Sequence, residues 1–586
     1  MAERFLENPV TTEIIRNAFI SAASEMNASL FRSAYSPVIY EGKDCSVGIF
    51  NEDCKILGQS AGLPLFLGNL EVAMEAAIAF YGGKDHFREG DVYLMNDAFL
   101  TGTHLNDMTV FTPIFYHDKL VGFTASRAHW MDVGAKDIGV SMDSTSIFQE
   151  GLRIPILQVF EAGKPRDDVI ETVCRNSRFY RNTKGDMFAQ IAASRTGEAR
   201  FVEILDRFGY ETVQRSIHDI FLQSEIMEAE AIAKFPEGEF TAEGSLDSDG
   251  QGNGPVDVKL KMTIRDGKIN IDLTGSSPQV PGATNCCMPQ TISACRVAYK
   301  SLVHPEAPVT GGSFKPLSVT CPPGTIFSAE EPAAVSFYYS SLGLLIDLII
   351  KSLDSAAPEL TGGAHYGDSM LLHCTGTNPK TGQPFLVNEA TPGGYGGCCT
   401  SDGQDALINC VNGDTHTLPV EVYEYNFPIK VESYQLRRDS AGPGKFRGGN
   451  GVIRSYKILV PDTHIFLWFE RSHTVPWGVA GGKAALGPHV SIAWNDGREP
   501  TEDLLKVNYL PIPVGAQITL RTGGGGGFGD PRTRDLDLVE KDVVQGYLSR
   551  EHAEKEYAVV FMQDGRLDRE ASAKLRMGSG VGEEAD

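Results

Sequence analysis

The chain has 586 residues, which is too long for one hydrophobic core and enough for three or four domains. Its net charge of −24 argues against nucleic acid or an anionic membrane as a partner. The most apolar run, 342–350, is short and contains Asp347, so no membrane span is expected. No signal peptide or C-x-x-C pair is visible, and we therefore expect a cytoplasmic protein with reduced thiols.

The N-terminal part of the sequence alternates helix and strand signals. Apolar residues recur at three- and four-residue steps over 11–32, which predicts a helix capped by one of two threonines at its start. Strand-forming residues at 46–50 and 55–57 predict a hairpin, and Asp44 stands directly before it. By its chemistry alone Asp44 reads as a structural carboxylate, although this position can reach a site on a neighbouring hairpin.

A second hairpin is predicted further along the chain. Residues 109–115 and 120–125 are rich in β-branched and aromatic side chains, and the polar residues 117–119 separate them. If Tyr116 pairs with Leu120, the two residue numbers of every cross-strand pair add up to 236.

This register brings metal-binding residue types together at the open end of the hairpin. Asp107 then lies opposite His129, with Cβ atoms about 4.5–5.5 Å apart. His104 can fold back onto the same point, because Gly102 loosens its loop. Two imidazoles and a carboxylate suit zinc, or manganese when more oxygen ligands join. A bulge at Pro113 would separate the pair, and the alternative interpretation is ordinary surface histidines beside a turn.

The rest of the sequence predicts an α+β multidomain protein. Helical spacing dominates up to Pro236, alternating strand patterns follow, and the last third combines strand patterns with many glycines. We expect an N-terminal α+β metal-site region at 1–165, a helical segment at 166–236, a mixed α/β middle domain at 237–425, a β-rich, glycine-rich C-terminal domain at 426–577 and a disordered tail at 578–586.

No nucleotide-binding motif stands in the required context. Gly524, Gly526 and Gly529 spell G-x-G-x-x-G, but Asp530-Pro531 follows instead of a helix. Close backbone packing explains these glycines better. There is no P-loop and no G-x-S-x-G elbow, so the sequence predicts no cofactor-binding residues for ATP.

Short motifs occur in order along nearly the whole chain, from about Thr12 to Tyr557. They are Asn96-Asp97, Gly102 to Asp107, Glu150 to Arg153, Gly185-Asp186 with Ala189-Gln190, Asp272 to Gly275 with Pro278-Gln279, Asp439 to Gly442, Lys445 to Gly449, Pro476 to Gly478 and Gly523 to Pro531. Together they resemble the hydantoinase B/oxoprolinase family.

The resemblance implies a component of an ATP-dependent enzyme that opens cyclic amides such as hydantoins, 5-oxoproline and lactams. A separate A-type subunit would bind ATP and magnesium, and two A and two B subunits would form a heterotetramer. The resemblance also implies that Asp44, His104, Asp107 and His129 hold one divalent metal, with zinc as the first expectation and manganese as the second. Where many relatives have histidines, this chain has 60–68 and Ala128, so the substrate does not follow from the resemblance.

Three functional hypotheses follow from this combination. The first is the metal-bearing subunit of a cyclic amidase, in which His104, Asp107 and His129 act on the activated substrate and Asp132 or Asp137 orients ligands or accepts a proton. The second is a subunit of a ketone carboxylase, to which more distant relatives belong. The third is a scaffold that uses the metal only for stability.

Overall fold

The computed structural model describes residues 8–578, so most of the tail that we expected to be disordered, from residue 579 on, lies outside the described residues. The chain divides into two compact units, each of which is described by itself. Unit 1 comprises Met1–Glu243, Ser248–Ile346 and Cys410–Leu418, and unit 2 comprises Gly244–Asp247, Asp347–Asn409 and Pro419–Asp586. Both contain helices and sheets, which confirms the expected α+β class.

A seven-stranded antiparallel sheet forms the centre of unit 1. Its strands occur in the order β2-β1-β5-β4-β3-β6-β7. They are β1 (Cys45–Asn51), β2 (Ile56–Gln59), β3 (Val92–Met95), β4 (Asp107–Tyr116), β5 (Lys119–His129), β6 (Leu157–Glu161) and β7 (Lys164–Pro165). Strands β4 and β5 are buried over most of their length, because helices cover both faces of the sheet.

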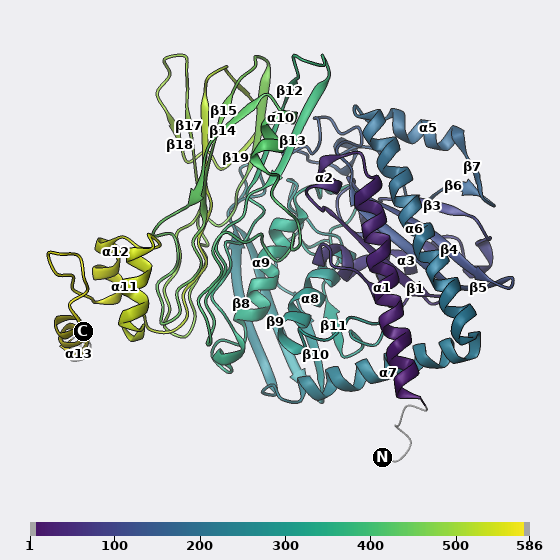
Figure 1. Cartoon of the computed structure of the whole chain (residues 1–586), viewed down its shortest axis with the longest axis horizontal. Helices are drawn as coiled ribbons and strands as arrows, with labels where there is room; N and C mark the ends of the chain where they lie inside the picture. Colours follow the sequence, from purple (N-terminus) through teal and green to yellow (C-terminus); the bar gives the residue numbers. More distant parts are fainter. Residues whose placement is uncertain (1–7, 579–586) are drawn as a thin grey trace. The chain divides into compact units, whose positions relative to one another are not determined.

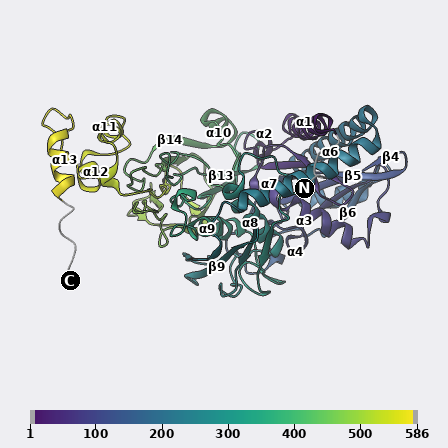
Figure 2. The same ribbon diagram turned by 90° about the horizontal axis from the view of Figure 1, so that it is seen from below.

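Helices α1 (Pro9–Ser33), α6 (Tyr180–Phe208) and α7 (Tyr210–Ile232) share one hydrophobic core with one face of the sheet. Helix α3 (Pro64–Phe80) packs on the opposite face (Figure 2). The predicted threonine cap of α1 is wrong: the cap is Asn8, whose side chain accepts a hydrogen bond from Thr11 N. Pro9 can occupy the first helical position because its missing N–H needs no partner there.

Unit 1 also holds a four-stranded sheet and further helices (Figure 1). The sheet order is β11-β10-β9-β8, with β8 (Gly238–Leu246), β9 (Val256–Arg265), β10 (Lys268–Asp272) and β11 (Leu317–Thr320); β8 begins in unit 1, and its residues from Gly244 on are assigned to unit 2. The helices are α2 (Pro37–Tyr40), α4 (Ala98–Thr101), α5 (Asp167–Arg175) and α8 (Met288–Val303); α9 (Tyr338–Lys351) begins in unit 1. None of the helices within residues 8–578 is both long and apolar enough to cross a bilayer.

The β4–β5 hairpin reaches the predicted register by a different route. Tyr116 pairs with Lys119 instead of Leu120, so the turn is the two-residue His117-Asp118. Both residues have positive φ, 48° and 62°, as a type I′ turn requires. A register shift between Ile114 and Phe115 then restores the predicted pairing. The bulge beside proline therefore exists, but it compensates for the tighter turn instead of separating the strand ends.

Two sheets and a group of C-terminal helices make up the regular part of unit 2. The sheet orders are β13-β12-β16-β19 and β14-β15-β20-β17-β18. The strands are β12 (Leu371–Thr377), β13 (Pro384–Ala390), β14 (Ile429–Leu436), β15 (Val452–Ile458), β16 (Thr463–Trp468), β17 (His489–Ala493), β18 (Thr501–Glu502), β19 (Lys506–Ile512) and β20 (Gln517–Arg521). The helices are α10 (Val420–Asn426), α11 (Leu536–Val544), α12 (Arg550–Tyr557) and α13 (Arg569–Gly578).

Glycine-rich segments of unit 2 are hydrogen-bonded backbone to backbone outside these sheets. The N–H of Gly525 donates to Gly449 O at 2.9 Å, that of Gly526 to Ala364 O at 2.9 Å, and that of Gly527 to Lys483 O at 2.9 Å. Three successive residues of one run thus bond to three different segments. We call this arrangement the glycine bundle, and it includes the run 523–527.

The backbone segments of the glycine bundle pack too closely to leave room for side chains. A Cβ atom on Gly525 would lie 1.9 Å from Tyr395 O, and one on Gly526 would lie 1.8 Å from Trp477 O. Atoms that are not bonded to each other cannot approach so closely. The G-x-G-x-x-G letters are therefore explained by packing, as expected.

Candidate metal centre

The hairpin of β4 and β5 places the first two residues of the site. Asp107 is the first residue of β4 and His129 the last of β5, and the two are direct partners across the ladder. They therefore project from the same face at the open end of the hairpin.

The loop before β4 adds the third residue. It leaves α4 through Gly102 and Thr103, whose φ angles of 72° and 74° turn the chain sharply, and the N–H of Asp107 then donates to His104 O at 3.1 Å. This turn brings the side chain of His104 back over the strand ends, as the sequence predicted.

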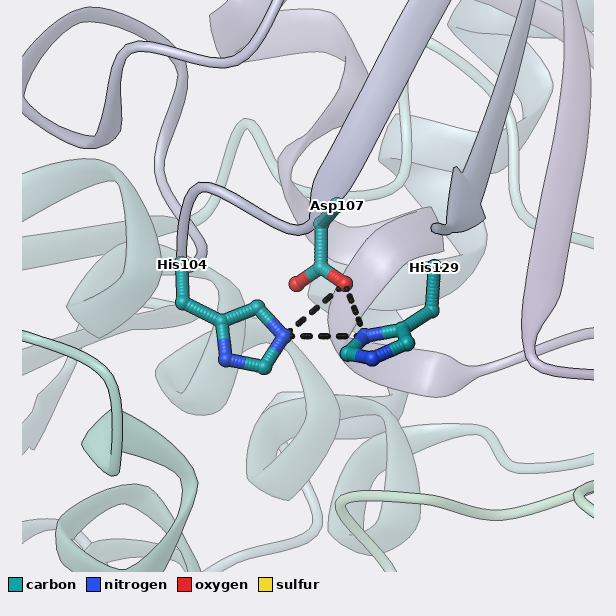
Figure 3. A group of neighbouring side chains, drawn as sticks. All are labelled: His104, Asp107 and His129. Carbon is teal, nitrogen blue, oxygen red and sulfur yellow. Dashed lines mark hydrogen bonds and ion pairs between the residues drawn. The ribbon is translucent and has the colours of Figure 1, made fainter. Parts of the chain in front are cut away.

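Three ligand-type atoms form an almost equilateral triangle (Figure 3). His104 Nε2 lies 3.1 Å from Asp107 Oδ1 and 3.1 Å from His129 Nδ1, and His129 Nδ1 lies 3.1 Å from Asp107 Oδ1. Ligands about 2.0–2.1 Å from a tetrahedral ion are about 3.3 Å apart. The triangle therefore fits one small divalent ion.

The hydrogen bonds around the triangle add a chemical argument for a cation. His104 Nδ1 lies 3.0 Å from Ser336 O, and a carbonyl oxygen only accepts, so Nδ1 carries the proton. In the neutral ring Nε2 then presents a lone pair toward Asp107 Oδ1. Because two lone pairs repel, this tautomer suits a positive charge among the three atoms.

The three side chains are nearly removed from solvent. His104 is 8% exposed, Asp107 1% and His129 4%. Burial acts against the charge of Asp107, but imidazoles in their protonated form outweigh it through their charges and hydrogen bonds, and the pKa of Asp107 is lowered. The pKa of His104 is raised, because Asp107 outweighs the effect of burial. Asp107 is thus held as a carboxylate.

Arg127 lies on the same face of β5, two residues before His129. It is fully buried, and its Nε donates to Thr109 Oγ1 at 2.7 Å while Asn69 accepts from Nη1. Burial lowers the pKa of Arg127 to about 10, with the charge of Asp107 opposing the shift. A fixed positive charge beside the site favours the ionised form of Asp107.

Asp44 approaches the site but stands outside the triangle. The group whose ligand atoms lie within 4.8 Å of one another consists of His104, Asp107 and His129. The backbone N–H of His129 donates to Asp44 O at 3.1 Å, and the Asp44 Oδ1 atom is buried without a hydrogen-bond partner among residues 8–578. Burial raises the pKa of Asp44 to about 6, and Asp107 adds to this rise while the imidazoles oppose it. Asp44 as a fourth ligand stays a prediction, supported by this unsatisfied oxygen.

Asp132 and Asp137 have other partners. Asp132 Oδ1 accepts from Arg178 Nη1 at 2.7 Å, and its Oδ2 accepts from Arg178 N at 2.7 Å. Asp137 lies 3.1 Å from Lys136 Nζ. The proton-accepting role of Asp132 stays a prediction, while its contacts describe an anchor for Arg178.

Sequence reasoning missed two groups that touch the triangle. Tyr338 Oη donates to Asp107 Oδ2 at 3.1 Å, and Ser336 supplies the carbonyl that holds His104. Both are more than 200 positions from the hairpin in sequence. No local spacing could have connected them.

The fold and the site together define a mixed α+β chain with a buried candidate metal centre of two histidines and one aspartate. The chain belongs to the hydantoinase B/oxoprolinase family, which matches residues 8–531. It is 29% identical over 592 residues to the B-type subunit of a putative D-/L-hydantoinase from Pseudomonas sp. (strain NS671), covering 97% of this chain and 98% of that protein.

A second relative is known from its structure. The chain is 29% identical over 574 residues to the beta subunit of the caprolactamase from Pseudomonas jessenii, covering 96% of this chain and 98% of that protein. The crystal structure of the ATP-dependent caprolactamase from that organism matches with a TM-score of 0.91 at 28% identity, covering 97% of this chain and 99% of that chain. An acetone carboxylase structure matches with a TM-score of 0.90 at 20% identity, covering 98% and 83%, which shows a shared fold.

Proposed function

We propose that the chain is the metal-bearing B-type subunit of an ATP-dependent cyclic amidase, which opens a hydantoin, oxoproline or lactam ring. The observation that carries this proposal is the buried triangle of His104, Asp107 and His129. The names of the relatives, which are components of a hydantoinase and of a caprolactamase, support the substrate class.

The chemistry of an amide explains the need for ATP. An amide is a poor electrophile, and phosphorylation of its oxygen makes the ring carbon more electrophilic. Water can then add to this carbon, the C–N bond breaks to give an amine and an acyl phosphate, and hydrolysis of the acyl phosphate releases phosphate and the free acid. A divalent ion in the triangle, zinc first and manganese second, would supply Lewis-acid chemistry and make a water more acidic. Asp107, kept ionised by its neighbours, and the two imidazoles would hold that ion, with Asp44 as the proposed fourth ligand. The low exposure of the triangle strengthens every electrostatic interaction within it.

We assign ATP and magnesium to a separate A-type subunit. The glycine motif at 524–529 is occupied by backbone packing, which supports this division. Both bacterial relatives are named as one of several subunits, B-type in the hydantoinase and beta in the caprolactamase, which also implies a partner. A cytoplasmic heterotetramer of two A and two B subunits remains our expectation, and mass measurement of the co-purified complex tests it.

Removal of either imidazole tests the metal assignment. In the complex with the A-type subunit, we expect His104→Ala and His129→Ala to lose the bound metal and to slow ATP-dependent ring opening by at least about 100-fold. His117→Ala is the matched control, because it removes a histidine from the far end of the same hairpin. Metal content is measured by mass spectrometry and ring opening by product analysis. Normal ring opening by a folded His104→Ala or His129→Ala complex would refute the proposal.

The shared fold of the acetone carboxylase chain favours ketone carboxylation as the second candidate. Labelled bicarbonate separates the two reactions: label retained in a stable product indicates carboxylation, whereas an unlabelled ring-opened acid indicates the amidase. A scaffold role predicts that chelation lowers the melting temperature but leaves turnover intact. The amidase proposal predicts that chelation abolishes turnover.

A further inference from the structure

The segment from Val335 to Tyr338, which leads into α9, contacts two sides of the triangle. Ser336 O accepts the hydrogen bond from His104 Nδ1 at 3.0 Å, and Tyr338 Oη donates to Asp107 Oδ2 at 3.1 Å. The tautomer of His104 and the orientation of the Asp107 carboxylate therefore depend on where this segment lies.

Glu150 binds the start of that segment. Its Oε1 atom accepts from Val335 N at 2.9 Å, from Ser336 N at 3.0 Å and from Ser144 Oγ at 2.7 Å. Glu150 follows the 3-10 turn η2 (Ile147–Gln149), whose Ile147 N–H donates to Pro332 O at 3.0 Å. The Oε1 atom of Glu150 thus binds the backbone amides of Val335 and Ser336, at the start of the segment that contacts the triangle.

Both backbone groups of Ser336, its N–H and its carbonyl, are consequently hydrogen-bonded. Glu150 accepts from its N–H, and its carbonyl accepts from His104. Glu150 is only 2% exposed, so water competes little with its Oε1 atom for these two backbone amides. A shift of Ser336 would move the partner of His104 directly.

We infer that Glu150 is a positioning residue of the metal centre, which orients His104 and Asp107 by holding the Val335–Tyr338 segment. The inference rests on the proposed function, because it takes the triangle to bind an ion. The role needs an acceptor oxygen at the position of Oε1 and does not need the negative charge. An amide side chain of the same length can supply that oxygen.

Metal affinity tests this inference independently of turnover. In the complex with the A-type subunit, zinc affinity is measured by competition with a chelator. We expect Glu150→Ala to weaken zinc binding by about 10–100-fold, the range typical for groups that orient metal ligands. We expect Glu150→Gln to stay within about three-fold of the wild type, because it keeps the acceptor. Wild-type affinity in Glu150→Ala, or equal losses in Glu150→Ala and Glu150→Gln, would overturn the inference.

Glu330→Ala is the matched control. Glu330 is an exposed glutamate, and it precedes the Val335–Tyr338 segment by only a few residues. We expect its zinc affinity to equal that of the wild type. A loss as large as in Glu150→Ala would mean that affinity follows the net charge of this region, which contradicts positioning.

Two further measurements separate positioning from folding and from the proposed function. If Glu150→Ala does not fold, Glu150→Asp keeps the charge but shortens the side chain, and we expect it to weaken zinc about 10-fold; unchanged affinity would overturn the inference. A merely structural role would lower the melting temperature of the metal-free complex without changing zinc affinity. If the wild-type complex binds neither zinc nor manganese, the proposed function fails; if it binds zinc and Glu150→Ala binds equally well, only the inference fails.

Discussion

The two oxygens of Asp107 have different partners, and this division orients the carboxylate. Oδ1 lies 3.1 Å from both imidazoles, whereas Oδ2 accepts from Tyr338 Oη. Contacts to both oxygens therefore restrain the plane of the carboxylate. A rigid carboxylate between two histidines loses little conformational entropy when an ion binds.

The protonation of Asp44 predicts how metal affinity depends on pH. Because burial raises its pKa to about 6, the carboxyl is neutral below this pH and charged above it. Metal ligands must be deprotonated, so we expect zinc affinity to rise around pH 6 as Asp44 loses its proton, and to rise further at higher pH, where His104, whose pKa is raised, loses its own. Zinc titrations at several pH values measure this. When zinc binds below pH 6, Asp44→Asn should release one proton fewer than the wild type does. Asp53→Asn, at an exposed position in the β1–β2 turn, is the control. An unchanged pH dependence in Asp44→Asn would argue against a fourth ligand.

At the scale of single residues, sequence reasoning succeeded where spacing is local. His104, Asp107 and His129 lie within one loop and hairpin, and their convergence was predictable. Asp44 came only from the resemblance, since its place depends on how β1 pairs with β5. Tyr338 was not predictable, because its contact with Asp107 spans 231 positions.

At the scale of elements, the β4–β5 turn is under local strain that sequence design can remove. Asp118 has a φ of 62°, in the left-handed region that glycine adopts without steric cost and that aspartate adopts at some cost. We expect the double substitution His117→Asn and Asp118→Gly to stabilise the chain by about 1 kcal/mol, because Asn-Gly is the preferred type I′ pair. The midpoint of urea unfolding measures this effect.

Two comparisons make this prediction specific. Zinc affinity should not change, because the turn lies at the opposite end of the hairpin from the metal centre. Asp118→Ala should destabilise, since alanine adopts a positive φ less readily than aspartate does. A lower unfolding midpoint for the Asn-Gly variant would contradict the turn type.

In the same hairpin, the pairing of Asp107 with His129 was predicted correctly although the turn was not. A three-residue turn without a bulge and a two-residue turn with one give the same partner for Asp107. The spacing of the sequence does not distinguish these two arrangements, because the register shift between Ile114 and Phe115 offsets the shorter turn.

At the scale of the whole molecule, the glycine bundle offers a matched pair of substitutions. A Cβ on Gly526 would lie 1.8 Å from Trp477 O, whereas one on Gly523 would meet nothing closer than 3.3 Å. We expect Gly526→Ala to prevent stable folding of unit 2 and Gly523→Ala to cost about 1 kcal/mol or less. Limited proteolysis and the melting temperature of the purified chain measure the difference. Equal stability of the two variants would refute the packing.

The overall fold was predictable in class but not in assembly. Strands with clear alternation, such as β9 and β10, lie in the part of the chain after Pro236 for which alternating strands are predicted. The glycine bundle was not predictable, because glycine carries no side-chain pattern and its partners come from distant segments, among them 363–364, 395–397 and 442–449. The Val335–Tyr338 segment likewise reaches the candidate metal centre only through the tertiary fold.

The glycine bundle also has a consequence for inheritance. A base change at either of the first two positions of a glycine codon removes the glycine, so every such change at Gly525 or Gly526 that does not create a stop codon introduces an atom where a carbonyl already lies. The gene can vary there only at the third codon position. We therefore expect this short run to tolerate almost no substitution, and a saturation library selected for expression should contain few variants at Gly525 and Gly526.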